Sequence, residues 1–320
     1  MPFLDQKFDG WKNDAQDLRD VKVEGGVLWG GHGSAVGSAV AEQQRLCGNA
    51  ECSSGWTVPW RSRKRPVFEG QWGCSGRCVL ALVRAAVQRE LGDGAVGPQP
   101  HRHRVPLGLV MLAQGWITHP QLRRALEAQR ENGSGRIGDW LVSECGLEAE
   151  QITRGLSMQW SCPVLPMKGF APEAMALVMP RVFVEEFGLL PLRVAGSRIL
   201  YLAFEDRLDA AAALAIEQMT ELKVESGLVD GKEFQPARRQ LLEYESVPVK
   251  IEVAADSDAL SARITAIVEQ KQPVASRLVR LHQYYWLRLW LERGAISGVG
   301  SLPKNSEDVR DFVFTLGGRA

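Results

Sequence analysis

The chain reads Pro106-Leu107-Gly108-Leu109-Val110-Met111-Leu112-Ala113-Gln114-Gly115-Trp116-Ile117 and, 30 residues further on, Arg136-Ile137-Gly138-Asp139-Trp140-Leu141-Val142-Ser143-Glu144-Cys145-Gly146-Leu147. In each copy a glutamine, Gln129 or Gln159, follows 21 residues after the first glycine. A repeat of this length is typical of a structural unit that packs against its own copy. Apolar residues three and four positions apart predict helices, so residues 104–160 are expected to form tandem helical hairpins.

Turn signals inside each copy agree with this division. Gly115 and Gly146 stand where the first helix should end, a position that favours a positive φ. Thr118 and Gln121 match a capping box, and Glu148 is a weaker cap at the matching place in the second copy. A plain helical scaffold that binds no ligand would show the same signals.

Residues 161–245 have the pattern of a small α/β module. Apolar runs at 187–194 and 199–204, separated by Ala195-Gly196-Ser197, predict a β-hairpin. Further along, the pattern predicts helices at 209–219 and 234–242 and strands at 222–229 and 247–253. The expected fold class is therefore α+β: a tandem helical-hairpin motif followed by a small α/β module, with a small cysteine-bearing segment N-terminal to both.

The doubled pattern resembles the N-terminal domain of type II secretion and type IV pilus assembly ATPases, the MshEN or GspE-N type. The similarity runs from about residue 104 to 245, through Cys162-Pro163-Val164-Leu165, Leu189-Leu190-Pro191-Leu192-Arg193 and 199–204. In such relatives the tandem motif implies binding of cyclic di-GMP through the motif arginine, backbone near the glycines and apolar side chains. The resemblance also implies a secretion or pilus assembly component as a partner.

Carried onto this sequence, the resemblance implies a set of ligand-binding residues. Those of the first copy are Leu107, Gly108 and Gln129, and those of the second copy are Arg136, Ile137, Gly138, Leu141 and Gln159. Two positions depart from the family pattern. Pro106 takes the place of the first arginine, with Arg104 the nearest candidate, and Cys145 takes the place of a glycine in the second copy. Proline donates no hydrogen bond, so any binding is expected to be weaker than in relatives with both arginines.

Four of the six cysteines form two close pairs, Cys47 with Cys52 and Cys74 with Cys78. Four thiolates complete a tetrahedral zinc site and leave no position open for catalysis, so this zinc would be structural. Residues 79–91 contain no glycine or proline, which places the second pair at the start of a helix, as in a treble-clef zinc finger. Free thiols that happen to cluster are the alternative.

Basic and aromatic residues lie between the cysteine pairs, namely Trp56, Trp60, Arg61, Arg63, Lys64 and Arg65. Such residues can contact nucleic acid. The whole chain, however, balances 38 basic against 38 acidic residues, which favours a solvated loop tip. A nucleic-acid-binding zinc finger is therefore the competing function.

Motifs for catalysis are missing from the sequence. The phosphate loop of an ATPase motor needs Gly-x4-Gly-Lys-[Ser/Thr], whereas the only Gly-Lys pair stands in Gly231-Lys232-Glu233. There is also no His-Glu-x-x-His and no Gly-x-Ser-x-Gly. We therefore expect no ATP binding and no enzyme activity.

The segments of the chain follow from these patterns. They are a flexible leader at 1–46, the zinc-finger-like segment at 47–92, the ATPase N-terminal-like domain at 104–245, and a C-terminal helical extension at 246–320. In the extension an amphipathic helix is expected at 274–293, which packs on its own protein or docks on a membrane or partner. No secretory signal or transmembrane run is visible, so the expected location is cytoplasmic, or peripheral at the inner membrane through a partner.

Together these features predict a non-catalytic regulatory or interaction module that senses cyclic di-GMP or recruits a secretion or pilus component. A degenerate scaffold that keeps the fold and binds no nucleotide is the remaining interpretation.

Overall fold

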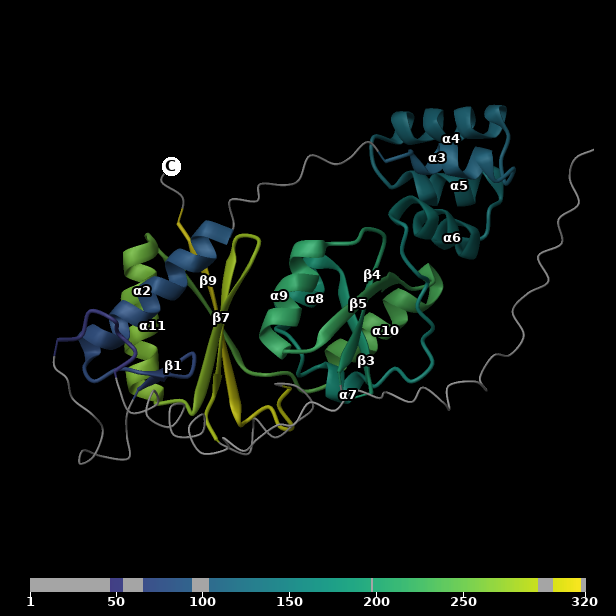
Figure 1. Cartoon of the computed structure of the whole chain (residues 1–320). Coiled ribbons are helices and arrows are strands. Elements are labelled where there is room, and N and C mark those ends of the chain that lie inside the picture. The colour runs from purple at the N-terminus through teal and green to yellow at the C-terminus, as the bar shows by residue number, and fades with distance from the viewer. Residues whose placement is uncertain (1–46, 54–65, 94–103, 197, 293–301, 318–320) are drawn as a thin grey trace, which may run out of the picture. The chain divides into compact units, whose positions relative to one another are not determined.

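The computed structural model describes residues 47–53, 66–93, 104–196, 198–292 and 302–317 (Figure 1). The predicted leader at 1–46 and the basic run at 61–65 lie outside the described residues. Helices and strands are mixed along the described chain, and the predicted α+β class is confirmed. No helix in the described ranges is both long and apolar enough to cross a membrane.

The tandem motif forms the predicted helical hairpins. Its helices are α3 (Leu107–Ala113), α4 (His119–Asn132), α5 (Ile137–Cys145) and α6 (Ala149–Trp160). Gly115 and Gly146 follow the first helix of each copy with φ of 69° and 70°, as their positions predict. Gln121 accepts a hydrogen bond from the Thr118 amide at 2.8 Å, and Glu148 begins α6 in the same manner.

The α/β module is built on a three-stranded sheet. Its elements are α7 (Pro172–Met175), α8 (Arg181–Phe187), β3 (Leu189–Ala195), β4 (Ile199–Phe204), α9 (Ala210–Thr220), β5 (Lys223–Leu228) and α10 (Gly231–Glu243). Strands β3 and β4 form the predicted antiparallel hairpin, and α9 crosses over to bring β5 parallel to β4.

A second, four-stranded sheet follows in the chain. It contains β6 (Val249–Ala254), β7 (Ala275–Leu281), β8 (Tyr284–Trp290) and β9 (Val309–Leu316), and α11 (Ser257–Lys271) joins β6 to β7. The strand order is β6-β9-β8-β7, with β6 parallel to β9 and the other neighbours antiparallel.

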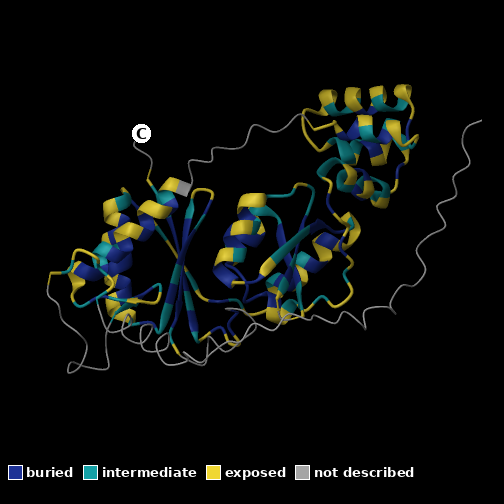
Figure 2. Ribbon diagram, viewed as in Figure 1, coloured by how far each residue is buried: buried dark blue, intermediate teal, exposed yellow. Residues whose placement is uncertain are grey.

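The expected helical extension is correct only as far as α11. The amphipathic helix expected at 274–293 is instead the β7–β8 hairpin, which turns at His282 with φ of 53°. Both faces of this sheet are covered, and β8 is buried along nearly its whole length (Figure 2). A strand buried on both faces loses the alternation of apolar and polar residues. The apolar positions of β7 and β8 therefore coincide with a helical period, which is why the sequence predicts a helix here.

The cysteine-bearing segment packs on this second sheet. It contains β1 (Val67–Phe68), β2 (Gln71–Trp72) and α2 (Gly76–Asp93), and α2 lies beside α11 (Figure 1). Val79, Val83 and Val87 of α2 share one hydrophobic core with Ile264 of α11 and Phe314 of β9. The described parts of segments 47–93 and 249–316, expected to be separate, therefore form one folded body, with residues 104–245 inserted between them in the sequence.

The other face of the second sheet packs on the α/β module. Val279 and Trp286 belong to the same core as Phe183 of α8 and Met219 of α9. Within this core Arg288 is fully buried, and its guanidinium makes two hydrogen bonds to Asp311, at 2.8 and 2.7 Å. A third bond, 3.1 Å long, goes to the carbonyl of Val178 in the α/β module. A buried charge is tolerated when it is paired and hydrogen-bonded in this way.

A titratable contact joins the tip of the β7–β8 hairpin to α9. His282 Nε2 lies 2.5 Å from Asp209 Oδ2, and Asp209 also accepts the amides of Ala211 and Ala212 at the start of α9. The hydrogen bond to Asp209 raises the pKa of His282 above its ordinary value. Burial alone would raise the pKa of Asp209, but the hydrogen bond from His282 outweighs it and the pKa is lowered.

We expect the His282→Asn variant to lose more stability at pH 5.5 than at pH 9. Because the folded-state pKa of His282 is raised, the pair stabilises fully below the unfolded value of about 6.5, and this contribution is lost as the pH rises through the folded pKa. Asp209 is ionised at both pH values. The imidazole is 35% exposed, so screening limits the effect to about 1 kcal/mol or less.

Urea unfolding of both proteins at the two pH values measures this difference. Asparagine tolerates the positive φ of the turn, so the backbone is left undisturbed. A stability difference that stays constant from pH 5.5 to 9 would show that the charge of His282 does not contribute.

Candidate functional site

The two copies of the tandem motif are related by a near two-fold arrangement. Helix α3 of the first copy packs on α6 of the second, and α4 of the first packs on α5 of the second. A Cβ added at Gly108 would meet Leu122 at 2.6 Å, and one added at Gly138 would meet Ile152 at 3.1 Å. These pairs are equivalent under the 30-residue offset. Both motif glycines therefore allow close contact between the helices of their own copy.

The two motif glutamines brace the copies against each other. Gln129 of the first copy donates to the carbonyl of Gly135, just before the second copy's motif, at 3.0 Å. Gln159 of the second copy donates to the carbonyl of Val105, just before the first copy's motif, at 2.9 Å. Each glutamine thus holds the beginning of the other copy. This reciprocal exchange explains why a glutamine closes both repeats.

The apolar members of the predicted ligand set lie mostly inside the motif. Leu107 and Leu141 are buried in the core of the four helices, and Ile137 packs against that core. Of the eight predicted residues, only Arg136 is exposed, with 56% of its side chain accessible. That these eight residues contact cyclic di-GMP stays a prediction.

Arg136 stands at the N-terminal end of α5 and reaches the α/β module. Its backbone amide donates to Asp139 at 3.3 Å, which fixes the start of the helix. Its Nη1 lies 3.3 Å from a carboxylate oxygen of Glu205 and 3.3 Å from one of Asp206, in the loop after β4. Gln235 of α10 donates to the same oxygen of Glu205 at 2.8 Å. The motif arginine is therefore held by an exposed ion pair that joins the two halves of this domain.

The first copy has no equivalent of this arginine. Pro106 occupies the matching position before α3. Arg104, the nearest candidate, lies with its guanidinium 3.3 Å from the ring centre of Trp160 and is held there by a cation–π contact. Two exposed apolar side chains, Val105 just before the first copy and Leu109 within it, were absent from the predicted set. Sequence periodicity alone did not distinguish them from core residues.

The four predicted metal ligands come together in the structure. The sulfur atoms of Cys47, Cys52, Cys74 and Cys78 all lie within 4.8 Å of one another. Sulfur–sulfur distances are 3.5 Å for the pairs Cys52–Cys74 and Cys74–Cys78. Bonds of about 2.3 Å in a tetrahedral zinc site place the sulfurs roughly 3.8 Å apart. The cluster therefore has the size that one such ion requires.

The backbone around the cluster has the order of a treble clef. A turn holds the first pair, with the Cys52 amide bonded to the carbonyl of Asn49, and Gly48 donates to Trp72 of β2 at 2.7 Å. The amide of Cys74 points at the sulfur of Cys47, 3.4 Å away. Burial disfavours the Cys78 thiolate, but hydrogen bonds led by that of Asn49 outweigh it and lower its pKa to about 6. Burial instead raises the pKa of Cys47 to about 11, so it is the hydrogen bonds of Cys78 that favour ionised sulfur, the form that binds metal.

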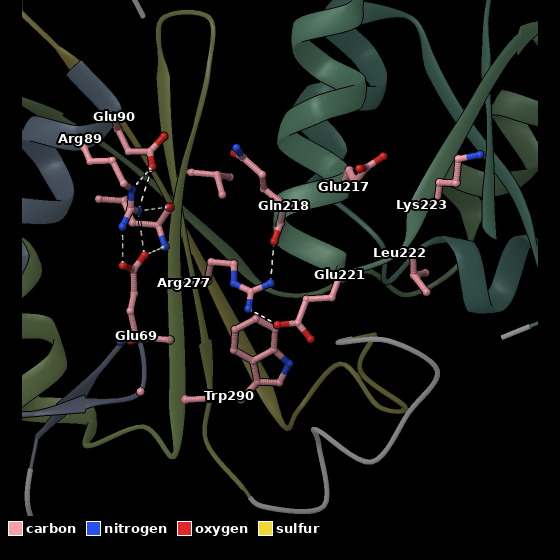
Figure 3. Close-up of a pocket in the computed structure, with 15 residues that line it drawn as sticks. Glu69, Arg89, Glu90, Glu217, Gln218, Glu221, Leu222, Lys223, Arg277 and Trp290 are labelled. Atoms are coloured by element: carbon pink, nitrogen blue, oxygen red, sulfur yellow. Dashed lines mark hydrogen bonds and ion pairs between the residues drawn. The ribbon is translucent and has the colours of Figure 1, made fainter. Parts of the chain in front are cut away.

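A groove of about 900 Å³ lies apart from both sites, along the outer edge of β7 (Figure 3). Arg89 binds Glu69 through two hydrogen bonds and also pairs with Glu90. The two carboxylates accept the outward amides of β7, Glu69 from Leu278 at 3.0 Å and Glu90 from Arg280 at 2.9 Å. The groove's charges therefore cover a strand edge and attach the cysteine-bearing segment to the sheet.

The end of α9 forms the opposite wall of the groove, and Arg277 of β7 contacts it. Its Nη1 donates to the carbonyl of Gln218 at 2.5 Å and it pairs with Glu221, so it caps the C-terminal end of α9 (Figure 3). None of the predicted site residues lines the groove. Its polar groups serve the fold, and we assign no ligand to it.

Comparisons with known proteins agree with the resemblance seen in the repeat. No family model matches the chain. The type IV pilus assembly ATPase PilB of Myxococcus xanthus (strain DK1622) is 33% identical over 96 residues, which make up 29% of this chain and 17% of PilB. The match thus spans less than a fifth of that relative's length.

Two solved structures are also similar to part of the chain. One of MshE with cdg, cyclic di-GMP, is 26% identical and covers 43% of this chain and 99% of that chain, with a TM-score of 0.36. The N-terminal domain of XpsE is 19% identical and covers 42% of this chain and 92% of that chain, with a TM-score of 0.30. The match to PilB confirms, at the level of sequence, the predicted resemblance to the N-terminal domains of secretion and pilus assembly ATPases.

Proposed function

We propose that residues 104–245 form a non-catalytic regulatory module that binds cyclic di-GMP through the tandem helical motif. The observation that carries this proposal is Arg136, the one predicted contact residue that is exposed at the start of a motif helix. The similarity to PilB and the intact arrangement of both copies support it. A guanidinium suits this ligand because it can pair with phosphate or a guanine edge and stack on a purine.

Ligand binding would compete with the contacts of Arg136 to Glu205 and Asp206. An exposed ion pair is worth about 0–1 kcal/mol, whereas a hydrogen bond to a charged group contributes roughly 1.5–3 kcal/mol. The ligand contact is therefore the stronger of the two. Release of Arg136 would remove the contact between the tandem motif and the loop after β4, while α6 stays packed on β5 and α10. This local change gives the module a way to pass on the signal.

Calorimetric titration with cyclic di-GMP tests the proposal. We expect Arg136→Ala to weaken binding by about tenfold to a hundredfold, and Pro106→Arg to strengthen it by supplying the missing guanidinium. Arg154→Ala is the matched control, because Arg154 is an exposed arginine of α6 that pairs only with Glu150 among the ion pairs of the described residues. Its affinity should equal that of the wild type.

A second variant tests the competition itself. Glu205→Gln combined with Asp206→Asn should tighten binding up to about fivefold, because Arg136 is then free. Absence of binding heat for both the wild type and Pro106→Arg would reject the nucleotide proposal and leave the helical scaffold. Binding that ignores Arg136→Ala would mean that the site lies elsewhere.

We also propose that the four-cysteine cluster holds one structural zinc ion. Four sulfur ligands fill the coordination shell, so the ion would stabilise the fold and activate no water. Secretion or pilus assembly proteins remain the proposed partners, with the chain in the cytoplasm and at the inner membrane only through such a partner. The nucleic-acid alternative depends on Arg61, Arg63, Lys64 and Arg65, outside the described residues, and stays a prediction.

A further inference from the structure

Strand β6 forms one edge of the second sheet, and no strand in the described part of the chain pairs with its outer side. On the inner side the backbone amide of Asp311 donates to the carbonyl of Pro248 at 3.1 Å, and that of Gly317 donates to the carbonyl of Ala254 at 2.7 Å. Backbone groups alternate in direction along a strand, so the odd-numbered residues between them turn their amides and carbonyls outward. Among the described strands, only β9 pairs with β6.

The two edges of this sheet differ in their protection. The outward amides of β7 are covered by the carboxylates of Glu69 and Glu90. Among the described residues no carboxylate covers the outer side of β6 in this way, and the side chains of Ile251 and Val253 on this strand are 54% and 74% exposed. An uncovered edge that carries exposed apolar residues is suited to pairing with another strand.

The sequence of β6 is complementary to itself. In an antiparallel pair of two β6 strands centred on Ile251, Lys250 of each copy lies opposite Glu252 of the other, and Val249 lies opposite Val253. The odd-numbered residues, whose backbone groups point outward, then form the hydrogen-bonded pairs. Opposite charges directly across from each other stabilise such pairing. A two-fold axis through the Ile251 pair satisfies both strands at once.

From these features we propose that two copies of the chain associate through β6, joining their four-stranded sheets into one continuous sheet. The helix above the edge has a surface that fits this arrangement. Arg263 of α11 forms two hydrogen bonds to Glu252, at 2.7 and 2.8 Å, and so marks the side of α11 that faces β6. Ala259 and Ala266 are exposed next to it on the helix surface. Their small side chains allow the α11 helices of the two copies to approach.

Light scattering on the full chain measures the association directly. At about 100 µM we expect a mass twice the 35.3 kDa of one chain, falling toward the single-chain mass on dilution. Val253→Lys should weaken the dimer at least about tenfold, since it places two charges beside the paired edge. Leu214→Lys on α9 is the matched control, because Leu214 is similarly exposed, at 55%, and lies away from β6.

A charge swap tests the orientation of the pair. Lys250→Glu alone and Glu252→Lys alone each place like charges opposite each other, so each variant should dimerise about tenfold more weakly. A mixture of the two variants restores opposite charges at both positions. We expect the mixture to form a heterodimer of near wild-type affinity.

Single cysteines test the register. Paired residues at a hydrogen-bonded position have Cα atoms about 5.5 Å apart, within reach of a disulfide. Ile251→Cys should therefore give a covalent dimer on mild oxidation, whereas Val253→Cys, which faces Val249, should give no more than the wild type. A single-chain mass at every concentration, or a dimer unaffected by Val253→Lys and by the charge variants, would overturn the proposal.

Discussion

Replacement of Arg288 by methionine is expected to lower the free energy of unfolding by about 3–5 kcal/mol. The substitution leaves Asp311 charged and buried, at 1% exposure, without its two hydrogen bonds from the guanidinium. It also removes the donor to the Val178 carbonyl, which links the second sheet to the α/β module. Urea unfolding followed by tryptophan fluorescence measures the loss.

A double variant and a surface control test whether the unpaired charge of Asp311 causes this loss of stability. Arg288→Met combined with Asp311→Leu should recover most of the lost stability, because no buried charge is left unpaired. Arg154→Met breaks the exposed pair with Glu150 on α6 and should cost only about 0.3–0.5 kcal/mol. If Arg288→Met costs no more than Arg154→Met, the buried pair contributes nothing to the link between sheet and module.

Substitution of Cys47 by serine is expected to reduce bound zinc from about one ion per chain to nearly none. Because the four-cysteine cluster lies at the start of α2, and α2 shares a core with α11 and β9, the loss should extend to the second sheet. We expect a cost of about 3 kcal/mol or more, seen as a fall in Tm of roughly 6–12 °C. Metal analysis and thermal unfolding provide the two measurements.

Hydrogen exchange locates the effect within the chain. Amides of β7 should exchange faster in Cys47→Ser, since the segment that covers this strand edge is loosened, while those of α3–α6 should be unchanged. Cys145→Ser is the control, because Cys145 lies in the tandem motif outside the cluster. Zinc-free wild-type protein, prepared with zinc available, would reject the metal proposal.

The parts of the fold that were predicted correctly depend on local signals. The tandem helices follow from a 3.6-residue period, and Gly115, Gly146 and Thr118 mark their ends by turn and cap chemistry. The β3–β4 hairpin follows from two apolar runs around a turn. The cysteine cluster follows from spacing, since four ligands of one kind in two pairs have few other uses.

The parts that were missed depend on contacts between distant segments. The sequence of the β7–β8 hairpin predicts a helix because burial of the strands on both faces removes the alternation of apolar and polar residues. The common core of α2 and the second sheet brings together residues on either side of the inserted domain, which no local pattern records. The bracing role of Gln159 also depends on a distant contact, since it donates to the carbonyl of Val105, 54 residues away. Gln129 contacts Gly135 only six residues on, but a repeat pattern does not indicate which carbonyl a glutamine reaches.

The folded body that contains α2 and the second sheet is divided in the sequence by residues 104–245, and this division has a consequence for synthesis of the protein. The ribosome completes α2 long before it reaches α11 and β9, since the whole inserted domain is translated in between. At about 5–20 residues per second, the interval from Asp93 at the end of α2 to Val309 at the start of β9 lasts roughly 10–45 s. During that time the inserted domain has all of its own strands and helices available, whereas Val79, Val83 and Val87 still lack their partners. The nascent chain therefore offers chaperones an apolar helix face that is hidden only after β9 has left the exit tunnel.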